Sequence, residues 1–366
     1  MAILLVAAAV LALYLLQNRL YRKFWQEGLF LDINFSAKEA FEGDSLYLQK
    51  TLVNKKILPL PWILSNFKIS RNLIFDKDTA HISDMQNKSD IFSVMMYEKI
   101  GRKMPFVCGR RGFYRLRNAE LVAGNLMHTQ TFTKKLDFFT ELTVFPRILS
   151  DYDELNIIYK ALDAAMLSNS LINPDPFEFK GIREYQPTDP LRNVNFKASA
   201  VSGHLMVNIH APTSAKSLEI ILNAEYNNPY PNFELYEQAI RLAGTIADKY
   251  IGEDVKISFF SNGSDIFTGN QIKIFGGNNP AHLYSVLQAL ARINLLYKPA
   301  GIANYLETLE DNSAVYLIIS PYYGNDFLLA LDSLEARGLN YMAVIPAEDS
   351  TENITETNKI KIWKAL

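Results

Sequence analysis

Strands and helices alternate from about Ser217 onward, and this order constrains the fold more than any other feature of the sequence. Compact apolar segments typical of buried strands lie at 218–222, 255–260, 315–319 and 341–345. Amphipathic segments typical of helices lie between them at 234–250, 282–296 and 326–336. The alternation predicts a parallel sheet with helices on both faces, and ligands of such sheets bind beyond the carboxyl ends of the strands.

Short strands dominate the earlier part of the chain, from about Gly28 to Leu149. Turn-forming residues recur at 42–44, 54–56, 87–88 and 109–112. Strands at this spacing predict a β-sandwich of Ig-like character. A helix is predicted after it, over Asp151–Leu167, because its apolar residues repeat with helical spacing.

The amino-terminal residues form an unbroken apolar run from Ala2 to Leu16, followed by Arg19, Arg22 and Lys23. A secretory signal peptide would instead carry basic residues before its apolar run and a small-residue cleavage site after it. We therefore expect a retained single-pass membrane anchor, with a signal peptide as the alternative. The basic residues after the run predict that the rest of the chain lies in the cytoplasm.

Together these patterns predict an α+β multidomain protein. We expect a membrane anchor at residues 1–25, a β-sandwich (Ig-like) domain at 26–149, a helix and charged linker at 150–200, and an α/β, Rossmann-like domain at 201–366.

Composition excludes several classes of function. A formal net charge of −2 argues against a nucleic-acid-binding protein, which usually has a basic domain. The single cysteine, Cys108, excludes an intrachain disulfide and a cysteine-rich metal site. Phosphate-loop, zinc-protease and nucleophile-elbow motifs are missing, and two of the five histidines, His204 and His210, have spacing that favours one strand face without a carboxylate partner. We therefore predict no catalytic residues, no enzyme activity and no cofactor.

Charged, aromatic and turn-forming residues are mixed without period in the run from Gly181 to Ala200. Pro187 and Pro190 flank Thr188 and Asp189 and predict a tight turn. Two interpretations are open: the run is a polar docking surface, or it is a salt-bridge network that fixes two domains against each other.

This run resembles the signature of the bacterial family called "domain of unknown function fifty-eight". The matching positions are Gly181, Arg183, Tyr185, Pro187, Asp189, Arg192, Lys197 and Ala200, whereas Thr188, Val194 and Phe196 depart from the pattern. The resemblance also includes residues 110–116, residues 142–147 and the apolar amino-terminal segment, so it extends over nearly the whole chain. Family members often carry two membrane spans, and this sequence shows one.

The resemblance implies that the α/β domain is similar to a von Willebrand factor A domain, whose metal site begins with Asp-x-Ser-x-Ser after the first strand. Here Asn223, Glu225 and Asn227 stand at these three positions, and Pro321 stands where a later strand often supplies another aspartate. Magnesium prefers carboxylate and hydroxyl oxygens in near-octahedral geometry. We therefore expect a degenerate site that holds no metal.

A basic cluster lies at Lys99, Arg102, Lys103, Arg110, Arg111, Arg115 and Arg117. It predicts either a solvated hairpin face or a surface that contacts anionic lipid headgroups near the anchor.

By resemblance, we expect a membrane-anchored, non-enzymatic protein-interaction or scaffold protein. Its expected partner is a MoxR-type AAA+ ATPase in the assembly or maturation of other proteins. The candidate binding residues are Arg183, Glu184, Tyr185, Asp189, Arg192 and Lys197. The alternatives are a divalent-metal-dependent adhesion domain that uses Glu225, and a hydrolase with an unrecognised site.

Overall fold

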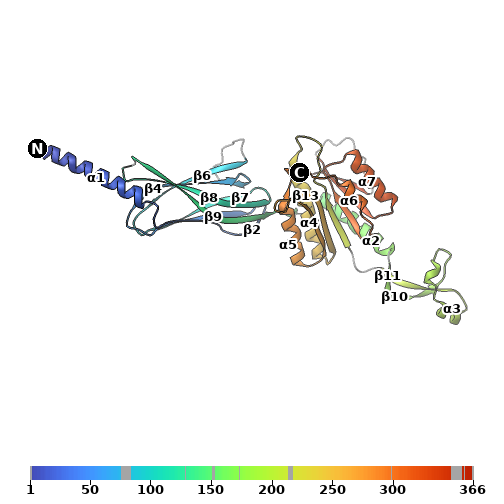
Figure 1. Ribbon diagram of the computed structural model, residues 1–366. Helices are drawn as coiled ribbons and strands as arrows, with labels where there is room; N and C mark the ends of the chain where they lie inside the picture. Colours follow the sequence, from blue (N-terminus) through green and yellow to red (C-terminus); the bar gives the residue numbers. More distant parts are fainter. Residues whose placement is uncertain are drawn as a thin grey trace. The chain divides into compact units, whose positions relative to one another are not determined.

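The computed structural model describes residues 2–75, 84–127, 129–150, 153–172, 174–212, 217–297, 299–347, 357 and 359–364. The chain divides into two compact units, Met1–Arg147 and Ile148–Leu366. The first contains an amino-terminal helix and a β-sandwich, and the second contains an α/β sheet domain and a small β-hairpin (Figure 1).

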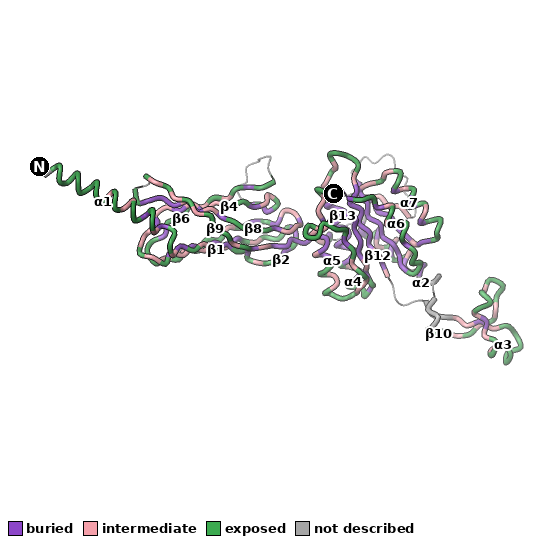
Figure 2. The backbone as a smooth tube through the Cα atoms, viewed as in Figure 1, coloured by how far each residue is buried: buried purple, intermediate pink, exposed green. Residues whose placement is uncertain are grey.

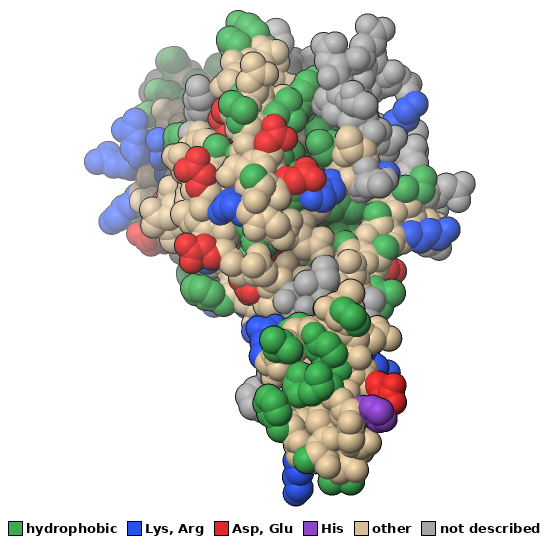
Figure 3. Space-filling view, turned by 90° about the vertical axis from the view of Figure 1, so that its right-hand side faces the viewer, with side chains coloured by type: hydrophobic (Ala, Val, Ile, Leu, Met, Phe, Trp, Pro, Cys, Tyr) green, Lys and Arg blue, Asp and Glu red, His purple; other side chains and the backbone are tan. Residues whose placement is uncertain are grey.

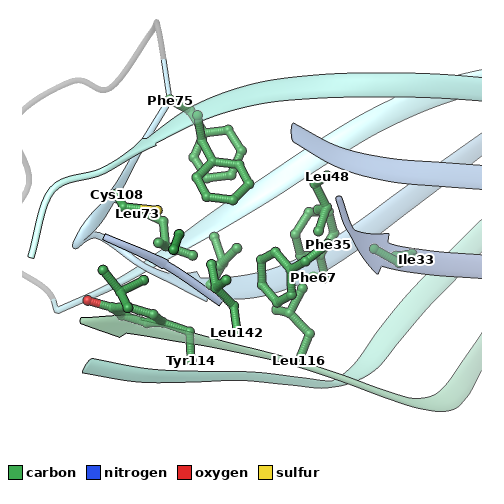
Figure 4. Packing of buried hydrophobic residues seen from close by; sticks show 14 of the residues in the cluster. Ile33, Phe35, Leu48, Phe67, Leu73, Phe75, Cys108, Tyr114, Leu116 and Leu142 are labelled. Atoms are coloured by element: carbon green, nitrogen blue, oxygen red, sulfur yellow. The ribbon is translucent and has the colours of Figure 1, made fainter. Parts of the chain in front are cut away.

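Two sheets form the sandwich, as predicted. One sheet has the order β1 (Leu29–Phe35), β3 (Ser45–Asn54), β7 (Lys99–Cys108), β5 (Leu73–Ile74). The other has the order β2 (Glu39–Phe41), β9 (Thr131–Phe145), β8 (Gly112–Gly124), β4 (Leu60–Ser70), β6 (Met85–Val94). Alternate residues of β3 and β4 are buried, as expected when one face of a strand meets the core. Phe35 and Leu48 of one sheet pack with Phe67 and Leu142 of the other (Figure 4).

The amino-terminal helix α1 (Ala2–Phe24) is partly built into the sandwich. Tyr21 and Trp25 are buried in a core cluster with Leu52 and Ile63, and the Tyr21 hydroxyl donates a hydrogen bond to the Pro59 carbonyl at 2.7 Å. The rest of the helix is mostly exposed (Figure 2). The segment Ile3–Phe24 is long and apolar enough to cross a membrane, and a signal sequence near the amino terminus has the same properties.

The second unit contains a doubly wound sheet. Its strands lie in the order β14 (Gln271–Gly277), β13 (Lys256–Asp265), β12 (Ser217–Leu222), β16 (Val315–Ile319), β17 (Tyr341–Ala347), β18 (Ile360–Lys364), and β15 (Ile293–Asn294) pairs with β13. The pairings from β13 to β18 are parallel, whereas β14 and β15 pair antiparallel with β13. Counted along the chain, the main strands follow the order 3-2-1-4-5-6 of doubly wound folds.

Helices lie on both sides of this sheet (Figure 1). They are α2 (Asp153–Ile172), α4 (Phe233–Gly252), α5 (Pro280–Arg292), α6 (Ala303–Glu307) and α7 (Asn325–Ala336). The α6 and α7 helices share a core with Ile221 and Ile318, and α4 contacts α2 through a hydrogen bond from the Tyr250 hydroxyl to Asp163 Oδ1 at 3.0 Å. The helix predicted to run to residue 296 ends at Arg292, because Ile293 adopts extended backbone geometry and begins β15.

The predicted charged linker is an antiparallel hairpin with its own short helices. Strands β10 (Pro174–Glu184) and β11 (Met206–Pro212) pair with each other, and η1 (Leu191–Asn193) and α3 (Phe196–Ser202) lie between them. We call residues 174–212 the hairpin module. The boundary predicted between residues 200 and 201 falls inside α3, which begins where the Asn195 side chain accepts a hydrogen bond from the Ala198 N–H and ends at Gly203 in the left-handed conformation.

Candidate functional site

The carboxyl ends of β12 and β16 meet at the point where the strand order reverses, which is where doubly wound sheets bind ligands. Asn223 follows β12, Ser320 follows β16, and both are fully buried. The Asn223 Nδ2 donates to Ser320 Oγ at 2.9 Å, and its Oδ1 accepts from Asn262 Nδ2 at 2.9 Å. The backbone N–H of Glu225 also donates to Asn223 Oδ1, at 3.0 Å. Amide side chains thus satisfy one another at the switch point.

The donor set at this point does not fit a divalent cation. The Asn223 oxygen already accepts two hydrogen bonds, and the Ser320 hydroxyl donates to the Tyr322 carbonyl. Glu225, the carboxylate expected to remain, accepts from the Ile302 N–H at 3.1 Å. Among the residues with described side chains, no three His, Cys, Asp or Glu lie together as a metal site. A cation here would have to break these hydrogen bonds. Its ligands would then be mainly amide oxygens, which magnesium disfavours.

A groove of about 410 Å³ opens beside the amide network. Its lining is uncharged and rich in tyrosine, asparagine and proline: Tyr226, Asn227, Asn228, Pro231, Asn232, Leu235, Tyr236, Pro321, Tyr322, Tyr323 and Gly324. Asn227 Nδ2 donates to the Tyr322 hydroxyl at 2.7 Å, and that hydroxyl donates to Asp326 Oδ1 at 2.8 Å. Burial, with the hydrogen bond to Asp326, raises the pKa of Tyr322 to about 12.

Sequence reasoning placed Asn223, Glu225 and Asn227 at this edge of the sheet but missed Asn262 and the tyrosines. The sequence could have predicted the position of Asn262, because this residue comes two positions after the apolar pair Phe259–Phe260 of β13. A polar residue in that position lies at the carboxyl edge when the strand is parallel to its neighbour.

The six candidate binding residues of the charged run fall into two groups. Arg183 and Asp189 form a bidentate ion pair, with both nitrogen–oxygen distances at 2.6 Å. Asp189 also accepts from the Gln186 N–H at 2.8 Å, which closes the predicted turn. The hydrogen bonds from Arg183 and from this N–H lower the pKa of the Asp189 carboxyl. This pair therefore fixes the turn that follows β10, and the Tyr185 N–H donates to the carbonyl of Leu205, just before β11, at 2.8 Å.

Glu184, Arg192 and Lys197 form the second group and lie exposed on the hairpin module. Large apolar side chains of the same module are also exposed: Phe179, Ile182, Leu191, Phe196, Val201 and Leu205. Phe196 and Val201, both on α3, are 76% and 86% exposed. Figure 3 shows hydrophobic side chains gathered on one face of this module, in the lowest part of the view. Such a patch on a small element is typical of an interaction surface.

The basic cluster does not form one surface. Arg102 pairs with Asp90, Lys103 lies over the Tyr47 ring, and Arg111 is buried. Strand β7 begins at Lys99, near the end of the sandwich that contacts α1. Arg110 and Arg111 come after the other end of this strand, about 30 Å farther along the sandwich. That distance separates them from any membrane crossed by α1. Arg115 and Arg117 instead line a groove of about 870 Å³ on the outer face of the five-stranded sheet.

The structure also describes the surroundings of Cys108 and of two histidines. Cys108 is buried, and burial raises the pKa of its thiol to about 11. His282 Nε2 is hydrogen-bonded to the Ile257 carbonyl at 2.7 Å. His204 lies exposed outside β11, while His81, His128 and the side chain of His210 lie outside the described residues.

No family model and no curated protein matches the chain. Similar solved structures include the CARDB domain of a Pyrococcus furiosus protein, at 11% identity over 32% of this chain and 94% of that one, with a TM-score of 0.22. A cohesin module from Clostridium perfringens matches at 7% identity over 32% of this chain and 98% of that one, with a TM-score of 0.26. An ASH / PapD-like domain of human CEP192 matches at 11% identity over 33% of this chain and 87% of that one, with a TM-score of 0.21. At these values the likeness says nothing about function.

Proposed function

We propose that this chain is a membrane-anchored, non-enzymatic interaction protein with a von Willebrand factor A-like domain. Its partner in this proposal is a MoxR-type AAA+ ATPase that acts in the assembly or maturation of other proteins. The observation that carries the proposal is the hairpin module, where the Arg183–Asp189 ion pair supports an exposed surface of apolar and basic side chains.

The α/β domain supports the A-like part of the proposal through its strand order and its switch point. Asn223, Glu225 and Asn227 occupy the edge at which an A domain holds its metal. Because amides stand at two of these three positions and Glu225 is the one carboxylate among them, binding through a metal bridge is disfavoured. The hairpin module is then the better candidate for the docking surface.

The chemistry of that surface predicts the chemistry of its partner. Among the side chains of this module that the structure describes, Lys180, Arg192 and Lys197 are exposed together with one acid, Glu184, since Asp189 is paired with Arg183. Exposed aromatic and aliphatic side chains among these charges favour a partner surface that is apolar and acidic. We therefore expect the contacted face of the ATPase to be acidic around an apolar centre.

The proposal is tested by photocrosslinking in intact membranes. A photoreactive amino acid replaces Phe196 of α3 in the full chain, and a matched variant carries it at Phe275, an exposed aromatic on β14. We expect an AAA+ ATPase to be crosslinked from position 196 and not from position 275. Crosslinking from position 196 to proteins of other classes alone would overturn the choice of partner.

A charge-reversal variant tests the surface itself. Arg192→Glu with Lys197→Glu should weaken binding to the crosslinked ATPase at least tenfold, because opposite charges become like charges. The melting temperature should stay unchanged, since both side chains are exposed. Lys160→Glu, on the exposed face of α2, serves as the control and should bind normally. Unchanged binding in the double variant would remove the hairpin module as the docking surface.

A further inference from the structure

A loop of the sandwich contacts α1 well inside its apolar segment. The Tyr14 hydroxyl donates to Thr129 Oγ1 at 3.1 Å, and Asn125 Nδ2 donates to Asn18 Oδ1 at 2.6 Å. Asn125 is fully buried, and its Oδ1 accepts from the Thr129 N–H at 2.8 Å. These hydrogen bonds hold the loop between β8 and β9 alongside the helix at the level of residues 14 to 18.

The position of this loop relative to a membrane follows from the helix. The segment that is apolar enough to cross a membrane is Ile3–Phe24, and Arg19, Arg22 and Lys23 near its end would lie at the headgroups. Tyr14 precedes Arg19 by a little more than one helical turn, or about 7.5 Å along the axis. A loop that touches Tyr14 therefore lies on the hydrocarbon side of these basic residues whenever α1 spans the bilayer.

The side chains at the tip of this loop are those expected at an apolar boundary. Leu126 and Met127 are 52% and 60% exposed, although loop tips in water are usually polar. Their neighbours Asn125 and Thr129 bond to each other and to α1, so these two polar side chains already have hydrogen-bond partners within the protein. Their burial beside the apolar tip therefore leaves neither side chain without a partner.

Two more loops lie at the same end of the sandwich, beside the residues that follow α1. The Lys56 ammonium group donates to the carbonyls of Trp25 and Glu27, and the Tyr97 N–H donates to the Lys56 carbonyl at 3.2 Å. These loops expose Ile57, Met95, Met96 and Tyr97. Apolar side chains with a tyrosine and nearby lysines are typical of the membrane–water interface.

We propose that this end of the sandwich inserts into the membrane around α1. We call the inserting residues the collar: Ile57, Met95, Met96, Tyr97, Leu126 and Met127. Leu126 and Met127 reach the acyl chains, and the other four lie at the interfacial layer. The sandwich would then contact the bilayer directly in a defined orientation, and it would not move freely about a linker. This inference rests on α1 being a membrane anchor.

The test measures the depth of single sites in the full chain in lipid nanodiscs. Cysteines are introduced by Leu126→Cys and Met96→Cys in the collar, Leu11→Cys in α1, and Phe139→Cys as an exposed apolar control about 30 Å along β9 from the loop. Each is labelled with a fluorophore at pH 7, where the buried Cys108 stays unreactive. Quenching by lipids that carry a spin label on the acyl chain is then compared among the four sites.

We expect quenching at positions 11, 126 and 96 to be several times greater than at position 139. Strong quenching at position 11, with position 126 equal to position 139, would leave the anchor in place and overturn the collar. Absence of quenching at position 11 would overturn the anchor itself, and the collar with it. The two failures are therefore distinguishable.

Discussion

Lys50 is a cation completely buried between the two sheets of the sandwich. Its ammonium group lies 3.5 Å from Asp90 Oδ2 and 4.5 Å from the centroid of the Phe67 ring. Burial lowers the pKa of this amine from its ordinary value of 10.5 to about 8, although Asp90 opposes the shift. The alternation of β3 places Lys50 on the same buried face as Leu48 and Leu52, although a lysine in a strand is ordinarily solvated.

The shifted pKa predicts how stability depends on pH. Between about pH 8 and pH 10.5 the unfolded chain binds more protons at Lys50 than the folded chain does, so the free energy of unfolding rises with pH in that window. Lys50→Met removes this dependence. We therefore expect the free energy of unfolding of the variant, minus that of the parent protein, to fall by about 2–3 kcal/mol from pH 8 to pH 10.5.

Denaturant titrations followed by tryptophan fluorescence at a series of pH values measure this difference. Lys68→Met, at an exposed position of β4, is the matched control. A difference between Lys50→Met and the parent protein that stays constant with pH would show that the buried amine has an ordinary pKa.

At the scale of elements, α1 combines an apolar composition with packing against the sandwich. Its exposed residues are apolar enough for a membrane, while Tyr14, Asn18, Tyr21 and Trp25 contact the sandwich at helical spacing. Cleavage after Trp25 would remove two core side chains from the sandwich. The helix is therefore part of the fold as well as a candidate anchor.

Tyr21→Ala should destabilise the sandwich by about 3–5 kcal/mol, because it removes a fully buried ring and leaves the Pro59 carbonyl without its donor. Leu20→Ala, one position away and 42% exposed, should change stability by less than about 0.5 kcal/mol. Thermal unfolding of the full chain in detergent compares the two variants. Equal effects would mean that α1 does not pack on the sandwich.

The hairpin module shows the limit of periodicity at this scale. Its strands and helices are short and follow one another within residues 174–212, so no window holds enough repeats to reveal a period. The turn at Pro187–Pro190 was predictable from local chemistry, and it is present. The sequence left open a docking surface or a salt-bridge network between two domains. The observed pair joins Arg183 to Asp189 within the module, and the exposure of Arg192 and Lys197 depends on how the module folds.

At the scale of the whole molecule, each unit has its own hydrophobic core. The core clusters of the sandwich use residues before Arg147, and the cluster beneath α6 and α7 uses residues after Ile148. Because neither set depends on the other for burial, the two units should fold independently.

A fragment of residues 148–366 should therefore fold alone and melt in one cooperative transition, as followed by circular dichroism. A shorter fragment that begins at residue 217 lacks α2, whose Leu155, Ile158, Leu162 and Met166 are buried. This shorter fragment should melt at a clearly lower temperature, since removing α2 exposes the surface around Tyr250. A longer fragment that fails to fold would show that the sandwich is required.

The sequence by itself determined four strands and four helices of the second unit (β12, β13, β16, β17, α2, α4, α5 and α7), the strand-rich character of the first unit, and which helix suits a membrane. These features follow from apolar spacing over five to twenty neighbouring residues, and such spacing is local information. Only the tertiary structure decided which polar groups meet. Asn223 bonds to Asn262 and to Ser320, which are 39 and 97 positions away in the chain. Their meeting depends on strand order, and strand order is set by how all the helices and strands bury their apolar faces together.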